Sequence, residues 1–285
     1  MKGNARFTVG LVLALIFASS LALGCARAGE LRTERRSVEL GSAEAVSTDL
    51  AMNSGNMVVA GGAEDLMDAT FVYNVPEWKP EVSYEGFGAE KNLVVAQPDV
   101  PGATFGNVRN DWEILLSDEV PMDLSVSNSS GDGELDLDDL SLGSLSVETS
   151  SGDVSADLGG DQALLEEVEV DSSSGDVGVE MTGDYSSAVS LETDLSSGDL
   201  TMDITGEWAE DLEGDLSVSS GTITLELPEN VGVYVEAETS SGDVSADGFR
   251  LEDDAYVNGA YGESDVTLGL SAEASSGDIN LRLAE

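Results

Sequence analysis

Apolar and polar residues alternate along most of this chain, with the period of two that is typical of β-strands buried on one face. In one stretch the apolar positions are Leu145 and Val147, and after a short interruption they are Val154 and Ala156. The alternation therefore changes from odd to even numbers between two successive strands. The same change separates Val168 and Val170 from Val177 and Val179, Val189 and Leu191 from Leu200 and Met202, Leu216 and Val218 from Ile223 and Leu225, and Leu268 and Leu270 from Ile279 and Leu281.

A change of parity means that one residue is inserted between the two strands, so a bulge or tight corner is expected there. Each insertion coincides with the tetrapeptide Ser-Ser-Gly-Asp, which has Thr222 as its last residue in one copy. Glycine adopts left-handed or bulged backbone at little cost, and we therefore interpret the motif as a turn. Its glycines are Gly131, Gly152, Gly175, Gly198, Gly221, Gly242 and Gly277.

These glycines recur at intervals of 21 to 23 residues, apart from a final interval of 35. Such a period is too short for paired helices and indicates a solenoid of strands. The segment 148–157 also reappears unchanged as 238–247, which suggests that whole rungs were duplicated. The predicted fold is all-β, a right-handed parallel β-solenoid with rungs of 21 to 23 residues, and the long last interval predicts a loop insertion or an irregular rung.

The solenoid is expected to begin near residue 38, because Gly55 lies at the same change of parity. A group of large aromatic residues precedes the regular repeats, and we interpret it as a cap over the apolar end of the stack. A platform for stacking carbohydrate is the alternative. These aromatics are Phe71, Tyr73, Trp78, Tyr84, Phe87 and Trp112. The predicted organisation is a signal peptide (1–24), a lipid-anchored tether (25–37), an N-terminal portion with the cap (38–123) and the repetitive solenoid (124–285).

The first residues have the pattern of a secretory signal, with Lys2 and Arg6 before an apolar stretch from Phe7 to Leu23. Gly24 and Cys25 follow at once, and Cys25 is the only cysteine of the chain. We predict that Cys25 becomes the lipidated N-terminus of a protein anchored outside the cytoplasm, at the cell surface or in the periplasm. The alternatives are a signal cleaved elsewhere and an uncleaved apolar anchor.

Charge excludes several functions. The chain has 57 acidic and 11 basic residues, a formal net charge of −46, and no histidine. A nucleic-acid partner is excluded because phosphate binding needs a basic surface. Between Arg109 and Arg250 there is no Lys or Arg, so the main body offers no basic side chain to act as a catalytic base or to hold an acidic substrate. We therefore predict no catalytic residues and no enzymatic activity.

The aspartates of the repeated motif would form a ladder with neighbours about 5 Å apart, where like charges repel. The ladder comprises Asp132, Asp153, Asp176, Asp199, Asp243 and Asp278. Diffuse counterions are the simpler way to relieve this repulsion. Specific Ca²⁺ sites along the ladder are the alternative, although no known calcium-binding loop motif is present. We expect no other cofactor.

Several motifs resemble those of the toast-rack family of bacterial envelope lipoproteins: Val38-Glu-Leu, the strand pair around Gly55, Gly61-Gly-Ala, Phe71-Val-Tyr-Asn, Pro80 to Tyr84, Asn110-Asp-Trp-Glu and Val120-Pro-Met-Asp-Leu. Residues 124–285 are similar to adhesin-type β-solenoid domains, related to the C-terminal domain of LiaF-like proteins of the cell-wall antibiotic response. The resemblance implies a structural or interaction protein that meets an unknown partner at the cell envelope. An extracytoplasmic module that regulates the envelope-stress response is the alternative.

Overall fold

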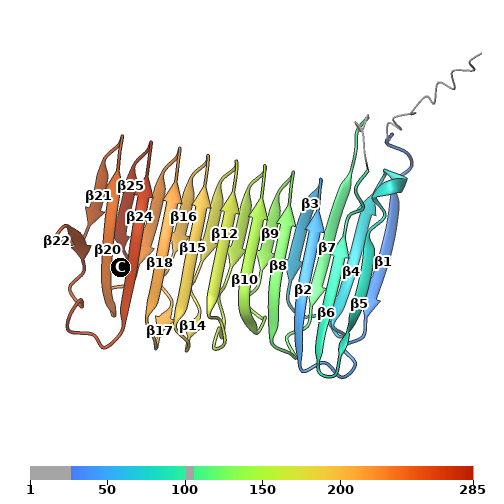
Figure 1. Cartoon of the computed structure of the whole chain (residues 1–285), viewed down its shortest axis with the longest axis horizontal. Coiled ribbons are helices and arrows are strands. Elements are labelled where there is room, and N and C mark those ends of the chain that lie inside the picture. Colours follow the sequence, from blue (N-terminus) through green and yellow to red (C-terminus); the bar gives the residue numbers. More distant parts are fainter. Residues whose placement is uncertain (1–26, 101–105, 285) are drawn as a thin grey trace, which may run out of the picture.

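The computed structural model describes residues 27–100 and 106–284 and consists almost entirely of β-strands, arranged as a long stack (Figure 1). Two extended sheets and one pair of short strands account for all of them. In spatial order, the first sheet contains β1 (Arg32–Val38), β4 (Met67–Tyr73), β7 (Asn110–Leu116), β3 (Asn56–Ala60), β9 (Gly133–Asp136), β11 (Val154–Asp157), β13 (Val177–Glu180), β16 (Leu200–Asp203), β19 (Ile223–Leu227), β25 (Ile279–Leu283) and β21 (Val244–Asp247).

The second sheet contains, again in spatial order, β22 (Arg250–Glu252), β23 (Ala255–Val257), β20 (Gly232–Thr239), β24 (Thr267–Ala274), β18 (Leu212–Val218), β15 (Val189–Leu195), β12 (Glu167–Ser172), β10 (Leu142–Thr149), β8 (Met122–Asn128), β2 (Ala45–Met52), β6 (Glu90–Ala96) and β5 (Glu81–Phe87). The short pair is β14 (Asp184–Tyr185) with β17 (Glu207–Trp208), and one 3₁₀ turn, η1, covers Pro76–Trp78. In the described residues, no helix is long and apolar enough to span a bilayer.

One rung consists of a longer strand of the second sheet, a Ser-Ser-Gly-Asp corner and a shorter strand of the first sheet. Successive rungs pair in parallel and in register, as β10 does with β12 and β11 does with β13. Side chains of the predicted parity point between the sheets: Val147 lies inside before the corner, and Val154 and Ala156 lie inside after it. The parallel β-solenoid and the inserted residue at each corner are thus confirmed.

Rungs do not stack in the order of the sequence at either end of the rod. The first complete rung, β2 and β3, lies between the strands β6 and β7 on one side and the strands β8 and β9 on the other. At the far end, the last rung of the chain, β24 and β25, lies between β18–β19 and β20–β21. The long final interval is therefore an antiparallel hairpin, β22–β23, followed by a regular rung placed one position inward.

The N-terminal end differs from the predicted tether. Residues 32–38 form strand β1, which pairs antiparallel with β4, so this part of the predicted tether (25–37) belongs to the sheet. Four of the six aromatic residues of the predicted cap are buried, namely Phe71, Tyr73, Trp78 and Trp112. Phe71 and Trp112 are buried in edge-to-face contact, with ring centroids 5.3 Å apart, so their faces are closed to a stacking sugar. Phe87 is an exception, because its side chain is 98% exposed at the turn between β5 and β6.

Replacing a corner glycine tests the packing of the rungs. Gly175 has φ of +119°, and a Cβ added there would lie 2.0 Å from the carbonyl oxygen of Gly152 in the neighbouring rung. We expect Gly175→Ala to reduce the free energy of unfolding by about 3 kcal/mol. At Gly178, in the adjoining strand, an added Cβ would make only an ordinary contact with the carbonyl oxygen of Val154 at 4.0 Å, and Gly178→Ala should change stability by less than about 0.5 kcal/mol. Denaturant unfolding of both variants measures the difference, and equal losses would contradict this account.

Candidate functional site

The corners form a continuous column along one edge of the rod. Each corner glycine except Gly242, which lies in the terminal rung, donates its backbone N–H to a serine carbonyl of the next rung, as Gly152 does to Ser174 at 3.2 Å and Gly175 to Ser197 at 3.2 Å. The backbones approach so closely that only hydrogen fits at each Cα. In spatial order, the column comprises Gly55, Gly131, Gly152, Gly175, Gly198, Gly221, Gly277 and Gly242.

The aspartate that follows each glycine has a structural role that the sequence did not reveal. In five of these aspartates, the carboxylate oxygen Oδ1 accepts a hydrogen bond from the backbone N–H at the equivalent position of the next rung: Asp132, Asp153, Asp176, Asp199 and Asp278. Asp153 accepts from Asp176 at 2.9 Å, and Asp176 accepts from Asp199 at 2.9 Å. The carboxylate therefore supplies the acceptor for an N–H that the glycine corner leaves without a backbone partner.

The structure divides the predicted aspartate ladder into two parts. Asp132, Asp153, Asp176 and Asp199 are consecutive, and Thr222 then interrupts the row. Asp278 and Asp243 form the second part, in the reverse of their sequence order, with Asp278 accepting from Asp243 at 2.9 Å. Within 27–100 and 106–284, no group of three or more carboxylate, histidine or cysteine side chains is placed to hold a metal ion.

Beside the first part of the ladder, the outer face of the first sheet is hollowed into an open groove of about 720 Å³. Its floor crosses β3, β9, β11, β13 and β16, and Asp132, Asp153, Asp176 and Asp199 form one wall. Along β11, β13 and β16 the floor carries the small or hydroxyl residues Ser155, Gly178 and Thr201, so the surface is hollow there. Glu134 and Val58 continue the same row on β9 and β3. The groove is shallow and continuous, and it could receive an extended chain more readily than a compact small molecule.

A second acidic row runs parallel to the ladder on the same sheet. Direct neighbours in this row are Asp136, Asp157, Glu180, Asp203 and Glu226. A hydrogen bond with Asp138, together with burial and repulsion from nearby carboxylates, raises the pKa of Asp136 above its ordinary value. A carboxyl group with a raised pKa destabilises the fold when charged, so its contribution to stability improves as the pH falls through that pKa. The groove therefore lies between two rows of mutually repelling carboxylates.

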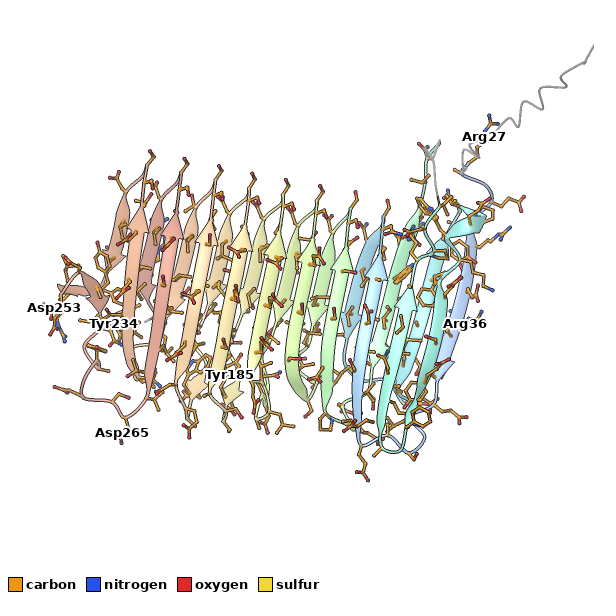
Figure 2. All side chains as sticks on the ribbon, in the orientation of Figure 1. Arg27, Arg36, Tyr185, Tyr234, Asp253 and Asp265 are labelled. Atoms are coloured by element: carbon orange, nitrogen blue, oxygen red, sulfur yellow. The ribbon has the colours of Figure 1, made fainter. Side chains whose placement is uncertain are left out.

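The second sheet is acidic on its outer face as well. Glu169, Glu192 and Asp215 are direct neighbours on β12, β15 and β18. Basic side chains lie towards the two ends of the rod instead. Figure 2 shows Arg27 and Arg36 at one end, and Arg250 and Arg282 lie in β22 and β25 at the other. Among the described residues, the ion pairs are Glu34 with Arg36 and with Lys79, Arg109 with Asp111, and Arg250 with Glu252. From β8 to β19 the rod thus has no basic side chain of its own to neutralise its charge, and Arg282 of β25 is the first basic neighbour, directly beside Glu226.

The predicted lipidation site, Cys25, and the predicted signal peptide (1–24) lie outside the described residues. The chain enters the described region at Arg27, and Gly29 donates its N–H to the carbonyl of Asn74 at 2.7 Å. This bond ties the segment beyond Cys25 to the N-terminal end of the rod.

Two protein-family models match the chain. The model described as the N-terminal domain of toast_rack (DUF2154) matches residues 27–179, and the one described as Toastrack DUF4097 matches residues 122–282. Together they span nearly all of the described chain, and they overlap across the first regular rungs. No curated protein matches the chain.

Two solved structures are similar to the chain. A protein from Clostridium sporogenes that is proposed to act in cell adhesion is 26% identical, with a TM-score of 0.50, and the match covers 90% of this chain and 100% of that one. A proposed adhesin from Bacteroides fragilis is 11% identical, with a TM-score of 0.37, and the match covers 90% of this chain and 99% of that one.

Substitutions at Asp176 can separate the hydrogen bond from the charge. Asp176→Ala removes the acceptor for the N–H of Asp199 and should cost about 1 kcal/mol of stability. Asp176→Asn keeps an Oδ1 acceptor and removes a repelling charge, so we expect it to be neutral or stabilising. Asn56 is a natural precedent, because its Oδ1 accepts from the N–H of Asp132 at 3.2 Å. Thermal or denaturant unfolding provides the measurement, and a destabilised Asn variant would show that the charge itself is required.

Proposed function

The chain belongs to the toast-rack family, because each of the two matching family models covers more than half of the chain, and we propose that it is a lipid-anchored, acidic interaction protein of the cell envelope. In this proposal it acts as an adhesin-like rod without catalysis. The observation that carries it is the groove beside the aspartate ladder, where one rung after another presents equivalent groups at a spacing of about 4.8 Å. A surface of this kind suits repeated weak contacts with an extended partner.

The chemistry of the groove supports binding rather than reaction. Its walls carry carboxylates, and its floor carries Ser155 and Thr201, whose hydroxyls have no histidine or lysine beside them to activate them. The solved relative that is 26% identical is itself proposed to act in cell adhesion. A non-catalytic role at the cell surface agrees with both observations.

Charge specifies the partner further. Parallel acidic rows on both sides of the groove attract cationic groups and repel anionic ones, which favours a partner that displays positive charge along its length. The floor adds hydroxyl groups that can form hydrogen bonds to such a partner. Binding should therefore weaken as the salt concentration rises, because exposed charges are screened.

Anchoring through Cys25 would hold the N-terminal end at the membrane, since Gly29 is already bonded to the body of the rod. The stack would then project its groove and its far end away from the bilayer. The basic side chains of β1, Arg32, Arg35 and Arg36, would lie nearest to anionic headgroups. This orientation leaves the acidic surface free for a partner.

The predicted lipid anchor can be tested by removing the thiol of Cys25. Cys25→Ala removes the thiol to which a diacylglyceryl group would be attached, so the expressed full chain should leave the membrane fraction or be processed abnormally. Ala28→Ser serves as the matched control and should remain in the membrane fraction. Fractionation followed by immunoblotting measures the distribution. A Cys25→Ala chain that partitions with lipid as the wild type does would show that an uncleaved apolar segment is the anchor.

The groove can be tested by filling it. Gly178 faces outward on its floor, and a Cβ added there would meet nothing closer than the carbonyl oxygen of Val154 at 4.0 Å. Gly178→Gln should therefore fold normally and weaken binding to bacterial envelope fragments by about tenfold. Gly269→Gln is the matched control, because Gly269 faces outward with similar space on the opposite sheet. Cosedimentation with envelope fragments over a range of NaCl concentrations gives the affinities, and equal effects of the two variants would exclude the groove as the binding surface.

A further inference from the structure

The rod ends in a rung whose sequence belongs to the middle of the stack. Residues 238–247 of the terminal rung are identical to residues 148–157 of an interior rung. The interior copy is covered on both sides, by β8–β9 and by β12–β13. Among the residues that the structure describes, the terminal copy is covered on one side only, by β24–β25, and β21 is the last strand of its sheet. One sequence therefore occupies two environments, and only in the second is a stacking surface left open.

The open side exposes residues that are buried in the interior copy. Val154 and Ala156 are 5% and 3% exposed, whereas their counterparts Val244 and Ala246 are only partly buried. Ala237 on the adjoining strand β20 is also only partly buried. The end of the hydrophobic core thus reaches solvent on this side of the corner.

The backbone of the terminal rung is unpaired in the same place. In the interior copy, Gly152 and Val154 donate their N–H groups to Ser174 and Asp176 of the next rung, at 3.2 and 3.0 Å. For the equivalent N–H groups of Gly242 and Val244, the described part of the chain provides no acceptor. Edge strands of this kind are templates for pairing with a further strand.

The hairpin β22–β23 covers only the other half of this end. It pairs with β20 at Tyr234 and Val235, away from the corner, and Val235 is fully buried there. Figure 1 shows β22 beyond the end of the stack, with the corner of the β20–β21 rung standing clear of it. The half of the terminal rung next to its corner is therefore left as a stacking surface.

The opposite end of the rod is protected against such pairing. In β1, Glu34 and Arg36 lie opposite Phe71 and Ala69 of β4, whose side chains are buried, so these two charged residues occupy core-facing positions. Core-facing charge on an edge strand prevents a further apolar rung from stacking there. Strand β21 has no such residue, because its core-facing positions are Val244 and Ala246. The two edges of the same sheet thus differ, and a head-to-tail filament is disfavoured.

Negative charge does not prevent stacking on the open end. Inside the molecule, Glu148 lies directly beside Asp171, and Asp157 lies directly beside Glu180, without a basic residue between them. The rungs of this protein therefore pair despite like charges in the same positions. A rung of the same kind is the surface that fits the open end.

We infer that the open half of the terminal rung binds the terminal rung of a second copy of this chain, with the two β21 strands antiparallel about a twofold axis. A twofold contact of this type is closed, so it yields a dimer of rods joined at their C-terminal ends. The axis displaces each β22–β23 hairpin past the corner of the other copy. If the proposed anchoring holds, rods from two facing membranes could meet in this way, but the contact itself depends neither on the anchor nor on the groove.

A cysteine near the axis tests the inference. Ser245 faces outward in β21, and in a twofold pair of these strands it lies close enough to its counterpart for a disulfide. Ser155 occupies the same position of the identical interior segment and is the matched control. Under mild oxidation of the full chain in detergent, we expect Ser245→Cys to give about tenfold more cross-linked dimer than Ser155→Cys. Both variants retain Cys25, so any bond through that residue contributes equally.

A second variant examines the apolar part of the contact. Ala246→Arg places a charge at a core-facing position of the edge strand, as Arg36 does in β1, and it should abolish the excess cross-linking of Ser245→Cys. Circular dichroism and the melting temperature establish that the double variant is folded. Equal cross-linking of Ser245→Cys and Ser155→Cys would overturn the inference, as would a cross-link from Ser245→Cys to Ser37→Cys in β1, which would indicate head-to-tail assembly. Gly178→Gln should leave the cross-link unchanged, so failure of the groove proposal and failure of this one are distinguishable.

Discussion

The approach of one corner backbone to the next is the constraint on which this structure depends. At each corner the carbonyl oxygen of one glycine occupies the place where a Cβ of the next would lie, as Gly131 shows for Gly152 at 2.1 Å. Glycine is therefore needed both for its backbone conformation and for the absence of a side chain. The adjacent aspartate completes the same contact, because its Oδ1 accepts the N–H that the corner leaves free. These two residues explain why a motif of only four residues can set the register of a whole rod.

Such regularity makes rungs interchangeable, and this property explains why the spatial order of the rungs differs from the chain order at both ends of the molecule. A rung with inward Val or Leu residues and a glycine corner can stack on almost any other, so chain order need not match spatial order. The chain uses this freedom twice, placing β2–β3 inside β6–β7 at one end and β24–β25 inside β20–β21 at the other. The outermost strands then require features that interior rungs lack, and β1 meets this need with charged core-facing residues whereas β21 does not.

The sequence predicted the local structure of the rungs but not their arrangement. Alternation between Val147 and Val154 identified the strands, their faces and the corner, because burial on one face leaves a direct trace in residue type. The spatial order of the rungs left no such trace, since equivalent strands with similar side chains pair with similar energies. Strand β1 was missed because Arg32, Glu34 and Arg36 have the composition of a solvent-exposed segment, although this charge is what suits them to a sheet edge.

The candidate site, too, could be predicted from the sequence only in part. The sequence indicates that the motif aspartates lie near one another, because identical motifs at a fixed period lie side by side in a solenoid. The division of the row at Thr222 depends on the spatial order of the rungs, which the sequence does not show. The hydrogen bonds of the aspartates could not be predicted, since an acidic residue after a turn glycine is as compatible with solvent or cations as with a backbone N–H. The groove beside them depends on what the floor lacks, namely side-chain volume at Gly178 and Ser155. One constraint thus produces both the fold and its surface: close backbone contact at the corners brings the carboxylates into a row, and small residues on the neighbouring strands leave a channel along it.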